Sequence, residues 1–360
     1  MRTFFWIVPA EGYNGRLWGT VIAAFGAVTL FIGTVQALKQ HDAKRLHAYH
    51  SIGQMGYILL GIGSALVMLY SGNPAVSLLS VVAIVGALYH TLNHTVFKGL
   101  LFLSTGSVLY ATGTKDLNKL GGLLKLMPAT AVVAGIASLS IAGMPVFSGF
   151  ASKWAIISSD ILAGHRMLFL AIFDIVALFT SAITLASYVK FFGMTFASSG
   201  VEWNVRRPIR EVPATMLIPK ILLAGLCLVQ GLFPIFFFET FIGIFKNADG
   251  SILQPVFSGV ALDRFIVNST MGVSVTVPGM NGMVSAVAVP VVILAVLAAG
   301  FLFAWLLKKS GGSEVKEVPT WLCGYQDLNN QNRYGAHHLY AAFKKALKWT
   351  GGNAKKDKAH

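Results

Sequence analysis

The sequence predicts an all-α integral membrane protein with about seven transmembrane helices and a basic tail. Of its 360 residues, 55% are hydrophobic and only 12% are charged, and the mean hydropathy is +0.68. This apolar content exceeds what one soluble core of this length can bury, so we expect lipid around most of the chain. A helix needs about 20 apolar residues to cross about 30 Å of hydrocarbon. The following segments meet that requirement: 17–38, 48–70, 76–110, 129–162, 167–192, 221–245 and 284–307.

The fourth segment, 129–162, is too long for a simple crossing and contains helix-breaking residues near its middle. Gly143 and Pro145 are followed closely by Gly149, and proline removes a backbone hydrogen bond from a helix. In hydrocarbon, the freed carbonyls are tolerated only where they are buried in protein or line a wet cavity. We therefore expect a broken helix with a functional role. A kink that serves packing alone is the alternative.

Basic residues alternate between the two sets of loops, and this alternation predicts the orientation of the chain. On one side, the segments contain 3, 3, 4 and 10 Lys and Arg residues: 39–45, 115–125, 206–220 and the tail from residue 308. On the other side, the segments contain 2, 0, 1 and 2: 1–16, 71–75, 163–166 and 246–282. We expect the N-terminus outside and the C-terminus in the cytoplasm. The net charge of +14 then reflects membrane topology and not nucleic-acid binding.

The basic tail contains apolar residues at the spacing of a helix face. Leu339, Phe343 and Leu347 recur at intervals of four, whereas Lys344 and Lys345 lie on other faces. This pattern is typical of an amphipathic helix in the headgroup plane of the lipid. A disordered basic tail is the alternative.

The third predicted helix carries three ionisable residues on nearly the same face. His90, His94 and Lys98 follow one another at intervals of four, and the stripe extends about 12 Å at about 1.5 Å per residue. Charged groups within the bilayer are expensive and face the protein interior or water. Histidine exchanges protons near neutral pH, and burial lowers the pKa of a lysine toward the same range, so that its amine can also exchange a proton. We expect a proton relay; the alternative is hydrogen bonding between helices, with Lys98 extending to an interface.

Lys153 follows the predicted break in the run SGFASKWAII and is the expected next station of the relay. A lysine beside freed helix carbonyls is stabilised when charged, and it can release its proton when the local field changes. The alternative is that Lys153 has no role in a relay and extends to the lipid headgroups. Asp174 is expected to be the only acidic residue well inside a span. It would either pair with Lys153 or Lys98, or lie shallow in the outer leaflet.

Histidines also begin the second predicted span on its cytoplasmic side. His47 and His50, with Gln54 after them, are candidates for an inlet through which protons reach the relay. Ordinary polar residues at headgroup level are the alternative. Lys190 and Lys220, near the inner ends of their spans, are expected to extend toward the headgroups.

The sequence contains no motif of redox or nucleophilic catalysis. Its two cysteines, Cys227 and Cys323, are isolated from each other, so neither a disulfide framework nor a clustered metal site is expected. It also lacks a glycine-rich dinucleotide loop. We expect no cofactor, no metal and no catalysis by this chain alone.

Three runs of the sequence resemble a known family: HDAKRLHAYHSIGQMGYILLGIG, HTLNHTVFKGLLFLSTGSVLYATGTKDLNKLGGLLKLMP and SIAGMPVFSGFASKW. They are similar to the second half of the antiporter-like membrane subunits of complex I, Mrp-type sodium/proton antiporters and membrane-bound hydrogenases. The resemblance covers about residues 17–192. It implies the second half of an inverted-repeat antiporter fold. It also implies that His90, His94 and Lys98 belong to the connecting helix of that half and Lys153 to its broken helix.

The late run TWLCGYQDLNNQNRYGAHHLYAAF is similar to the tail of the hydrogenase-4 component B and formate hydrogenlyase subunit 3 branch. This branch implies further membrane subunits and soluble nickel-iron hydrogenase and iron-sulfur subunits as partners, in the cytoplasmic membrane of a prokaryote. The first half of the family fold has no counterpart in the sequence. We therefore expect a fragment, or a split subunit whose first half-channel is a separate chain.

These expectations divide the chain into four parts: a truncated stub (1–16), a half-channel of five spans (17–192), two further transmembrane helices with loops (193–307) and a basic cytoplasmic tail with an interfacial helix (308–360). The expected function is translocation of protons, or of sodium ions, coupled to electron transfer in partner subunits. Two alternatives stay open. One is a membrane scaffold that does not pump, and the other is a freestanding Mrp-type cation/proton antiporter subunit.

Overall fold

Helices long enough to cross a membrane form most of the described chain. The computed structural model describes residues 14–164, 166–198, 208–247, 256, 266–269, 272–276, 284–288, 290–311 and 334–351. Within these residues, six helices have the length and composition of membrane spans: α1 (Gly15–Lys39), α2 (Ala43–Leu69), α3 (Pro74–Thr112), α7 (Leu168–Phe192), α8 (Ala214–Leu232) and α12 (Pro290–Ser310). The prediction of a multi-pass, nearly all-helical membrane protein is confirmed.

The fourth predicted span is broken, as the sequence predicts. It consists of α5 (Pro128–Ala142) and α6 (Ser148–Gly164), and neither helix alone has the length of a membrane span. Gly143 caps α5 with a φ of 79°, in the left-handed region that glycine adopts without steric penalty. The two helices follow each other across the bundle, so together they replace one continuous span.

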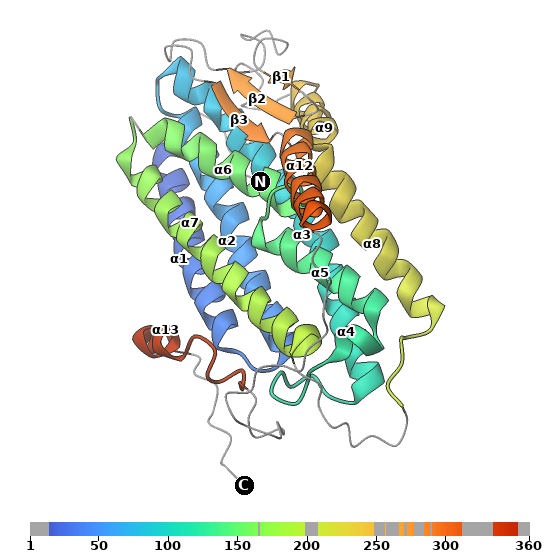
Figure 1. Ribbon diagram of the computed structural model, residues 1–360. Coiled ribbons are helices and arrows are strands. Elements are labelled where there is room, and N and C mark those ends of the chain that lie inside the picture. Colours follow the sequence, from blue (N-terminus) through green and yellow to red (C-terminus); the bar gives the residue numbers. More distant parts are fainter. Residues whose placement is uncertain are drawn as a thin grey trace.

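The helices form an antiparallel bundle with two distinct ends (Figure 1). One end, near the short helices α4 (Leu123–Leu126) and α13 (Ala341–Ala346), is named the α13 end. α1 ends there and α2 begins there, while α5 rises from it and α7 descends to it beside α1. The opposite end, where three short strands lie, is named the sheet end.

α1 and α2 pack closely because glycines of the two helices face each other, and those on α1 recur at intervals of seven. The paired positions are Gly19 with Gly63, Gly26 with Gly56, and Gly33 with Gly53. A Cβ at Gly26 would lie 2.5 Å from the backbone N of Leu60, and a Cβ at Gly56 would lie 2.4 Å from the backbone N of Leu30. Small residues allow transmembrane backbones to approach in this way. The contact fixes the position of α2, which carries much of the functional site.

The last two predicted spans, 221–245 and 284–307, differ from the observed elements. α8 begins before residue 221 and is followed by a separate helix, α9 (Pro234–Lys246), whose first position is occupied by proline, a residue favoured at the start of a helix. Residues at the start of the seventh predicted span form β3 (Val284–Ala288) in place of a helix. β3 pairs antiparallel with β2 (Gly272–Thr276), which pairs with β1 (Ile266–Ser269). The strand β3 depends on pairing with β2, which is a separate segment of the chain. The apolar residues 284–288 by themselves do not indicate a strand.

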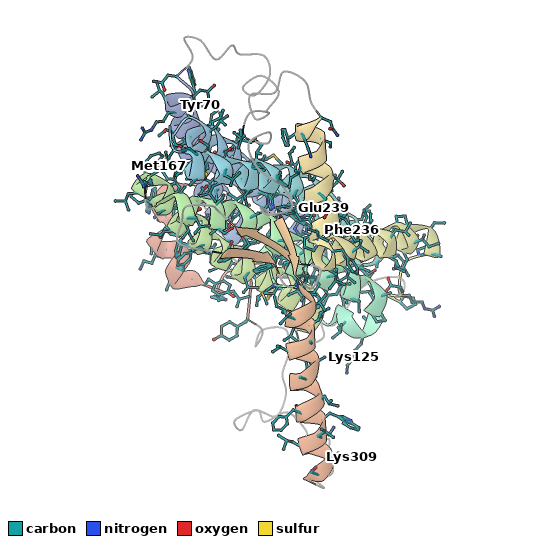
Figure 2. All side chains as sticks on the ribbon, turned by 90° about the horizontal axis from the view of Figure 1, so that it is seen from above. Tyr70, Lys125, Met167, Phe236, Glu239 and Lys309 are labelled. Carbon is teal, nitrogen blue, oxygen red and sulfur yellow. The ribbon has the colours of Figure 1, made fainter. Side chains whose placement is uncertain are left out.

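α12 lies apart from the other spans. Only 6% of its apolar window is buried, and in the view from above it extends away from the bundle, with Lys309 at its far end (Figure 2). Its apolar side chains therefore require cover from lipid or from other transmembrane helices.

The tail packs on the bundle and is helical over fewer residues than predicted. α13 has 6 residues and is followed by a 3-10 turn, Lys348–Thr350. Phe343 and Leu347 pack against α1 and α7, so the predicted apolar face is directed to protein. Several predictions lie outside the described residues: those for 1–13, Cys323, the run from residue 320 to 333, and residues 352–360.

Candidate functional site

The ionisable residues predicted on α3 are buried in the bundle. His90 is 0% exposed, His94 8% and Lys98 5%. The stripe therefore faces the protein interior, where neighbouring helices shelter it from the lipid.

α2 carries a second polar stripe, which crosses most of the bilayer. Its members recur at helical spacing and are all fully buried: His47, His50, Gln54, Tyr57 and Ser64. From His47 to Ser64 the stripe extends about 26 Å along the axis, close to the hydrocarbon thickness of about 30 Å. Polar residues of α3, α6 and α7 contact this stripe. The four helices together enclose a polar column that runs from the α13 end toward the sheet end.

Lys153 lies against the broken helix, in the middle of the column. Its Nζ donates a hydrogen bond of 2.7 Å to the carbonyl of Ile141, which belongs to the last turn of α5, where carbonyls have no partner within the helix. Its Nζ also lies 4.7 Å from the ring centroid of Tyr57. A Cβ at Gly143 would lie 3.1 Å from Cδ of Lys153. Glycine at the break therefore leaves room for the lysine.

α8 holds the break in position. Val146 has a φ of 79°, a strained conformation for a β-branched residue. Its carbonyl O would lie 2.0 Å from a Cβ at Gly231, so only glycine on α8 allows this contact. α8 is also joined to α3, where the hydroxyl of Tyr89 donates a hydrogen bond to the carbonyl of Gln230.

His90 joins α2, α3 and α6 in one hydrogen-bond network. Its Nε2 is 3.1 Å from Oε1 of Gln54 on α2, and its Nδ1 is 3.0 Å from Oγ of Ser152 on α6. Asn93 donates to the same Oγ at 3.1 Å and to the carbonyl of Ser148 at 2.7 Å. The residue that follows Ser152 in α6 is Lys153, so this network lies next to the broken-helix lysine.

Lys98 contacts the α2 stripe nearer the α13 end. Its Nζ donates a hydrogen bond of 2.6 Å to the carbonyl of His47. The His47 ring contacts Thr105 Oγ1 at 2.8 Å through Nε2 and Tyr188 Oη at 3.2 Å through Nδ1. His47 is fully buried, so its ring belongs to the column and does not face the lipid.

His50 and His94 lie one helical turn from the contact between Lys98 and His47. His94 precedes Lys98 by four residues on α3, and His50 follows His47 by three residues on α2. Within the described residues, both ring nitrogens of His50 and the Nε2 of His94 have no hydrogen-bond partner. Buried polar atoms of this kind are normally satisfied by ordered water. The region around these two histidines is therefore suited to hold water.

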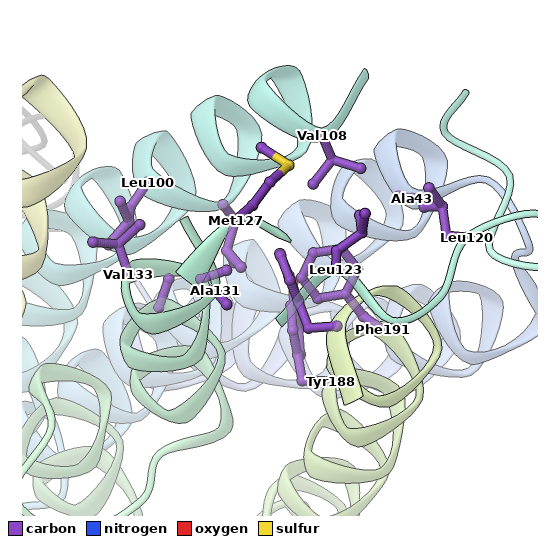
Figure 3. Close-up of a cluster of buried hydrophobic side chains, with 14 of the residues drawn as sticks. Ala43, Leu100, Val108, Leu120, Leu123, Met127, Ala131, Val133, Tyr188 and Phe191 are labelled. Carbon is purple, nitrogen blue, oxygen red and sulfur yellow. The ribbon is translucent and has the colours of Figure 1, made fainter. Parts of the chain in front are cut away.

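A hydrophobic cluster lies beside the column near the α13 end. Leu123 and Met127, near the start of α5, pack with Tyr188 and Phe191 of α7 in this cluster (Figure 3). The Tyr188 hydroxyl contacts His47, so the aromatic wall also provides a polar atom to the column.

Two carboxyl groups lie in the half of the column nearer the sheet end. Asp174 is 1% exposed and Asp160 is 0% exposed, so α6 provides a second buried acidic side chain in addition to the predicted Asp174. Asp160 Oδ2 accepts a hydrogen bond of 2.6 Å from Ser64. Neither lysine pairs with Asp174, because the one ion pair within the described residues joins Lys115 and Asp42.

Lys190 and Lys220 are enclosed by protein and do not extend to the headgroups as predicted. Lys190 is 1% exposed and Lys220 is 0% exposed. Lys220 donates to Thr130 Oγ1 at 2.7 Å. Thr130 in turn donates to Glu211 through its hydroxyl at 2.6 Å and its backbone N at 3.0 Å. Burial alone would raise the pKa of Glu211, but these hydrogen bonds and the charge of Lys220 hold it below its ordinary value.

The described residues contain no group of three or more His, Cys, Asp or Glu side chains that could hold a metal ion. Sequence reasoning also missed several members of the column, among them Tyr57, Asn93 and Ser152. The helical spacing of polar residues on α2 is a signal that could have located Tyr57. Asn93 and Ser152 required the three-dimensional packing, because each is an ordinary polar residue within an apolar helix.

Comparison with known proteins places the chain in a family. The family model described as NADH:quinone oxidoreductase/Mrp antiporter, TM, matches residues 3–184. Hydrogenase-4 component B of Escherichia coli (strain K12) is 32% identical over 313 residues, which cover 86% of this chain and 44% of that protein. Na(+)/H(+) antiporter subunit A1 of Staphylococcus saprophyticus is 35% identical over 254 residues, 69% of this chain and 30% of that one.

Solved structures agree in fold. A chain of the archaeal membrane-bound sulfane sulfur reductase has a TM-score of 0.69 and 26% identity, and the match covers 92% of this chain and 48% of that chain. A chain of the Mrp complex from Dietzia has a TM-score of 0.55 and 22% identity, covering 68% of this chain and 50% of that one. The chain thus spans about half or less of the length of these relatives. With the family match extending from α1 into α7, the chain belongs to the NADH:quinone oxidoreductase/Mrp antiporter transmembrane family.

Proposed function

We propose that this chain translocates protons as a membrane subunit of a multisubunit oxidoreductase of the hydrogenase-4 or formate hydrogenlyase type. One observation carries the proposal. Two buried lysines, Lys98 and Lys153, have no carboxylate partner among the described residues, and His50 and His94, on the two helices that Lys98 joins, have ring nitrogens without a hydrogen-bond partner among those residues. A fixed structural network would satisfy these atoms, whereas a proton path needs them for exchangeable water.

The arrangement supports a relay that runs from the α13 end. A proton that reaches His47 would pass to Lys98, cross the water-compatible region around His50 and His94, and arrive at Lys153. The charge of Lys153 acts on Lys98, so the arrival of a proton at one amine favours its release from the other. Electron transfer would take place in partner subunits, and this chain would supply only the path.

Partners, orientation and compartment are part of the same proposal. Further membrane subunits would cover α12, and soluble nickel-iron hydrogenase and iron-sulfur subunits would bind at the α13 end. The likeness to hydrogenase-4 component B supports this choice. The distribution of basic residues among the loops supports an orientation with the α13 end in the cytoplasm of a prokaryote and the sheet end outside.

Substitution of the two lysines tests the proposal in the complete complex. Lys98→Met and Lys153→Met should each reduce proton uptake by inverted membrane vesicles by about tenfold or more, as expected when a positioned proton carrier is removed. Lys125→Met is the matched control, because Lys125 is exposed beyond the column. The amounts of assembled complex in the membrane are compared by immunoblotting.

The outcomes distinguish a proton relay from a scaffold. Loss of uptake with normal assembly supports the relay. Unchanged uptake in both variants would refute the relay and favour a scaffold that does not pump.

Cation/proton exchange is a second candidate, and it is supported by the likeness to proteins named Na(+)/H(+) antiporter subunit A1. It predicts exchange of sodium ions for protons across vesicles without any electron donor. Sodium-dependent proton movement that persists when the redox reaction is inhibited would favour this candidate over coupling to electron transfer.

A further inference from the structure

Asp160 and Asp174 are buried carboxyl groups that the relay does not use. They come from α6 and α7, and Asp160 Oδ1 and both carboxyl oxygens of Asp174 have no hydrogen-bond partner within the described residues. α6 and α7 pack against each other, so the two buried carboxyls lie on neighbouring helices. The acidic pair thus combines one carboxyl anchored by Ser64 with a second, 1% exposed, that has no hydrogen-bond partner among the described residues.

Two adjacent carboxylates cannot both remain ionised in this setting at low cost. Like charges repel strongly in a low-dielectric interior, and neither aspartate forms an ion pair in the part of the chain described. A bound proton removes one charge and provides a hydrogen-bond donor. A proton is therefore the ligand that best satisfies the pair.

Tyr57 connects the pair to the relay. Its ring lies beneath Lys153 Nζ at 4.7 Å, and its hydroxyl donates to the carbonyl of Ala177 at 2.6 Å and contacts Ser181 Oγ at 2.5 Å. Asp174, Ala177 and Ser181 are spaced by three and four residues, so they share one face of α7. Lys153 therefore contacts the ring of Tyr57, and the hydroxyl of Tyr57 contacts the face of α7 that carries Asp174.

The acidic pair lies near the end of the column that is remote from His47. Asp160 comes about 6 Å before the end of α6 and Asp174 about 9 Å after the start of α7, at about 1.5 Å per residue. Both helices have these ends at the sheet end (Figure 1). A proton on the pair has thus crossed most of the hydrocarbon.

We propose that Asp160 and Asp174 form a proton-release site, a carboxyl pair that takes the proton from Lys153 and passes it to the surface at the sheet end. The inference rests on the proposed function and extends it. The proton leaves the ammonium of Lys153, which becomes a neutral amine, and joins a carboxylate of the pair, which becomes a neutral acid. The acid then releases a proton to water at the outer surface, so charge is conserved at each step.

Carbodiimide labelling tests proton occupancy without measuring transport. Dicyclohexylcarbodiimide partitions into membranes and reacts with protonated carboxyls. In the complete complex in its membrane, we expect adducts on Asp160 or Asp174, located by mass spectrometry and declining as the pH is raised. The double variant Asp160→Asn/Asp174→Asn should lose them. Glu239→Gln, at an exposed carboxyl on α9 (Figure 2), should leave them unchanged.

Sodium ions provide the decisive competition. If sodium chloride suppresses labelling and potassium chloride at the same concentration does not, the pair is a sodium site and the proton-release proposal is overturned. Absence of adducts over the whole accessible pH range would also overturn it. Labelling that responds to pH and not to sodium supports it.

Transport then separates this inference from the proposed function. Asp174→Asn should reduce proton uptake by about tenfold or more, whereas Asp174→Glu should retain most of it. If Lys153→Met abolishes uptake while Asp174→Asn and the double variant Asp160→Asn/Asp174→Asn leave it unchanged, the release site is refuted and the relay stands. If all of these variants leave uptake unchanged, both proposals fail.

Discussion

The buried lysines of the bundle differ in how completely their amines are bonded. Near the α13 end, Lys39 Nζ donates to Leu347 O, Thr350 Oγ1 and Gly351 O. Lys190 and Lys220, in the same region, donate to two oxygens each. In the middle of the column, Lys98 and Lys153 each make one hydrogen bond within the described residues.

This difference indicates two uses of a buried lysine. An ammonium has three donors, and an amine whose donors are occupied by protein is fixed and serves as a crosslink. An amine with free donors can bind water and exchange its proton with it. Burial alone therefore does not identify a relay lysine; the number of protein partners does.

The largest predicted effect is a loss of stability when a lysine with several protein partners is replaced. Lys190→Met removes the partner of the carbonyls of Leu38 and Gln40, at the turn between α1 and α2. Because an unsatisfied buried group costs about 1–3 kcal/mol, we expect a loss of about 2–5 kcal/mol in the free energy of unfolding. Lys98→Met should cost less, since the carbonyl of His47 lies inside an intact helix and keeps its backbone partner.

Denaturant unfolding of the purified protein in detergent measures this difference, with the exposed Lys125→Met as control. If Lys98→Met destabilises the protein as much as Lys190→Met, the number of protein partners does not separate the two groups of lysines.

A smaller, local effect is expected at Lys39. Lys39→Met removes three hydrogen bonds from the segment 347–351, which is partly exposed, so water can replace some of them. We expect the tail to be released while the bundle stays folded. Limited proteolysis should then cut within residues 334–351 in the variant and spare the wild type. Lys345→Met, at an exposed position on α13, is the control that should stay resistant.

The smallest effect is a pH dependence of tail docking. The His41 ring packs on His337 with centroids 3.8 Å apart. Burial and the positive charges of His337, Lys190 and Lys344 lower the pKa of His41 from 6.5 to about 3. The released state therefore binds more protons below pH 6.5, and docking, complete at neutral pH, should weaken as the pH falls from 6.5 toward 3. Burial also lowers the pKa of Lys344 from 10.5 to about 8. Docking should therefore also weaken as the pH falls from 10.5 toward 8.

A nitroxide attached through Lys345→Cys, with Cys323→Ser, would report release of α13 as increased mobility at acid pH. His41→Asn should flatten this response because the titrating ring is removed. Mobility that does not change with pH in the parent protein would contradict the assignment to His41.

Much of the column was predictable from local pattern. The stripe of His90, His94 and Lys98 on α3 and the break before Lys153 depend on spacing and on proline and glycine, which act within one segment. Their roles in a relay stay predictions. Asp160 was overlooked because it lies close to the end of the predicted span, and its neighbour Asp174 is on a different helix.

The sequence by itself determined most of the membrane-spanning helices, where the fourth span breaks and which residues of α3 share a face, because hydropathy and helical period are properties of consecutive residues. Only the tertiary structure decided which lysines are crosslinks and which have free donors. Lys190 meets Leu38 across a separation of 152 residues, and Lys39 meets Gly351 across 312. Hydrogen-bond partners at such distances are fixed by packing, and no local pattern encodes them.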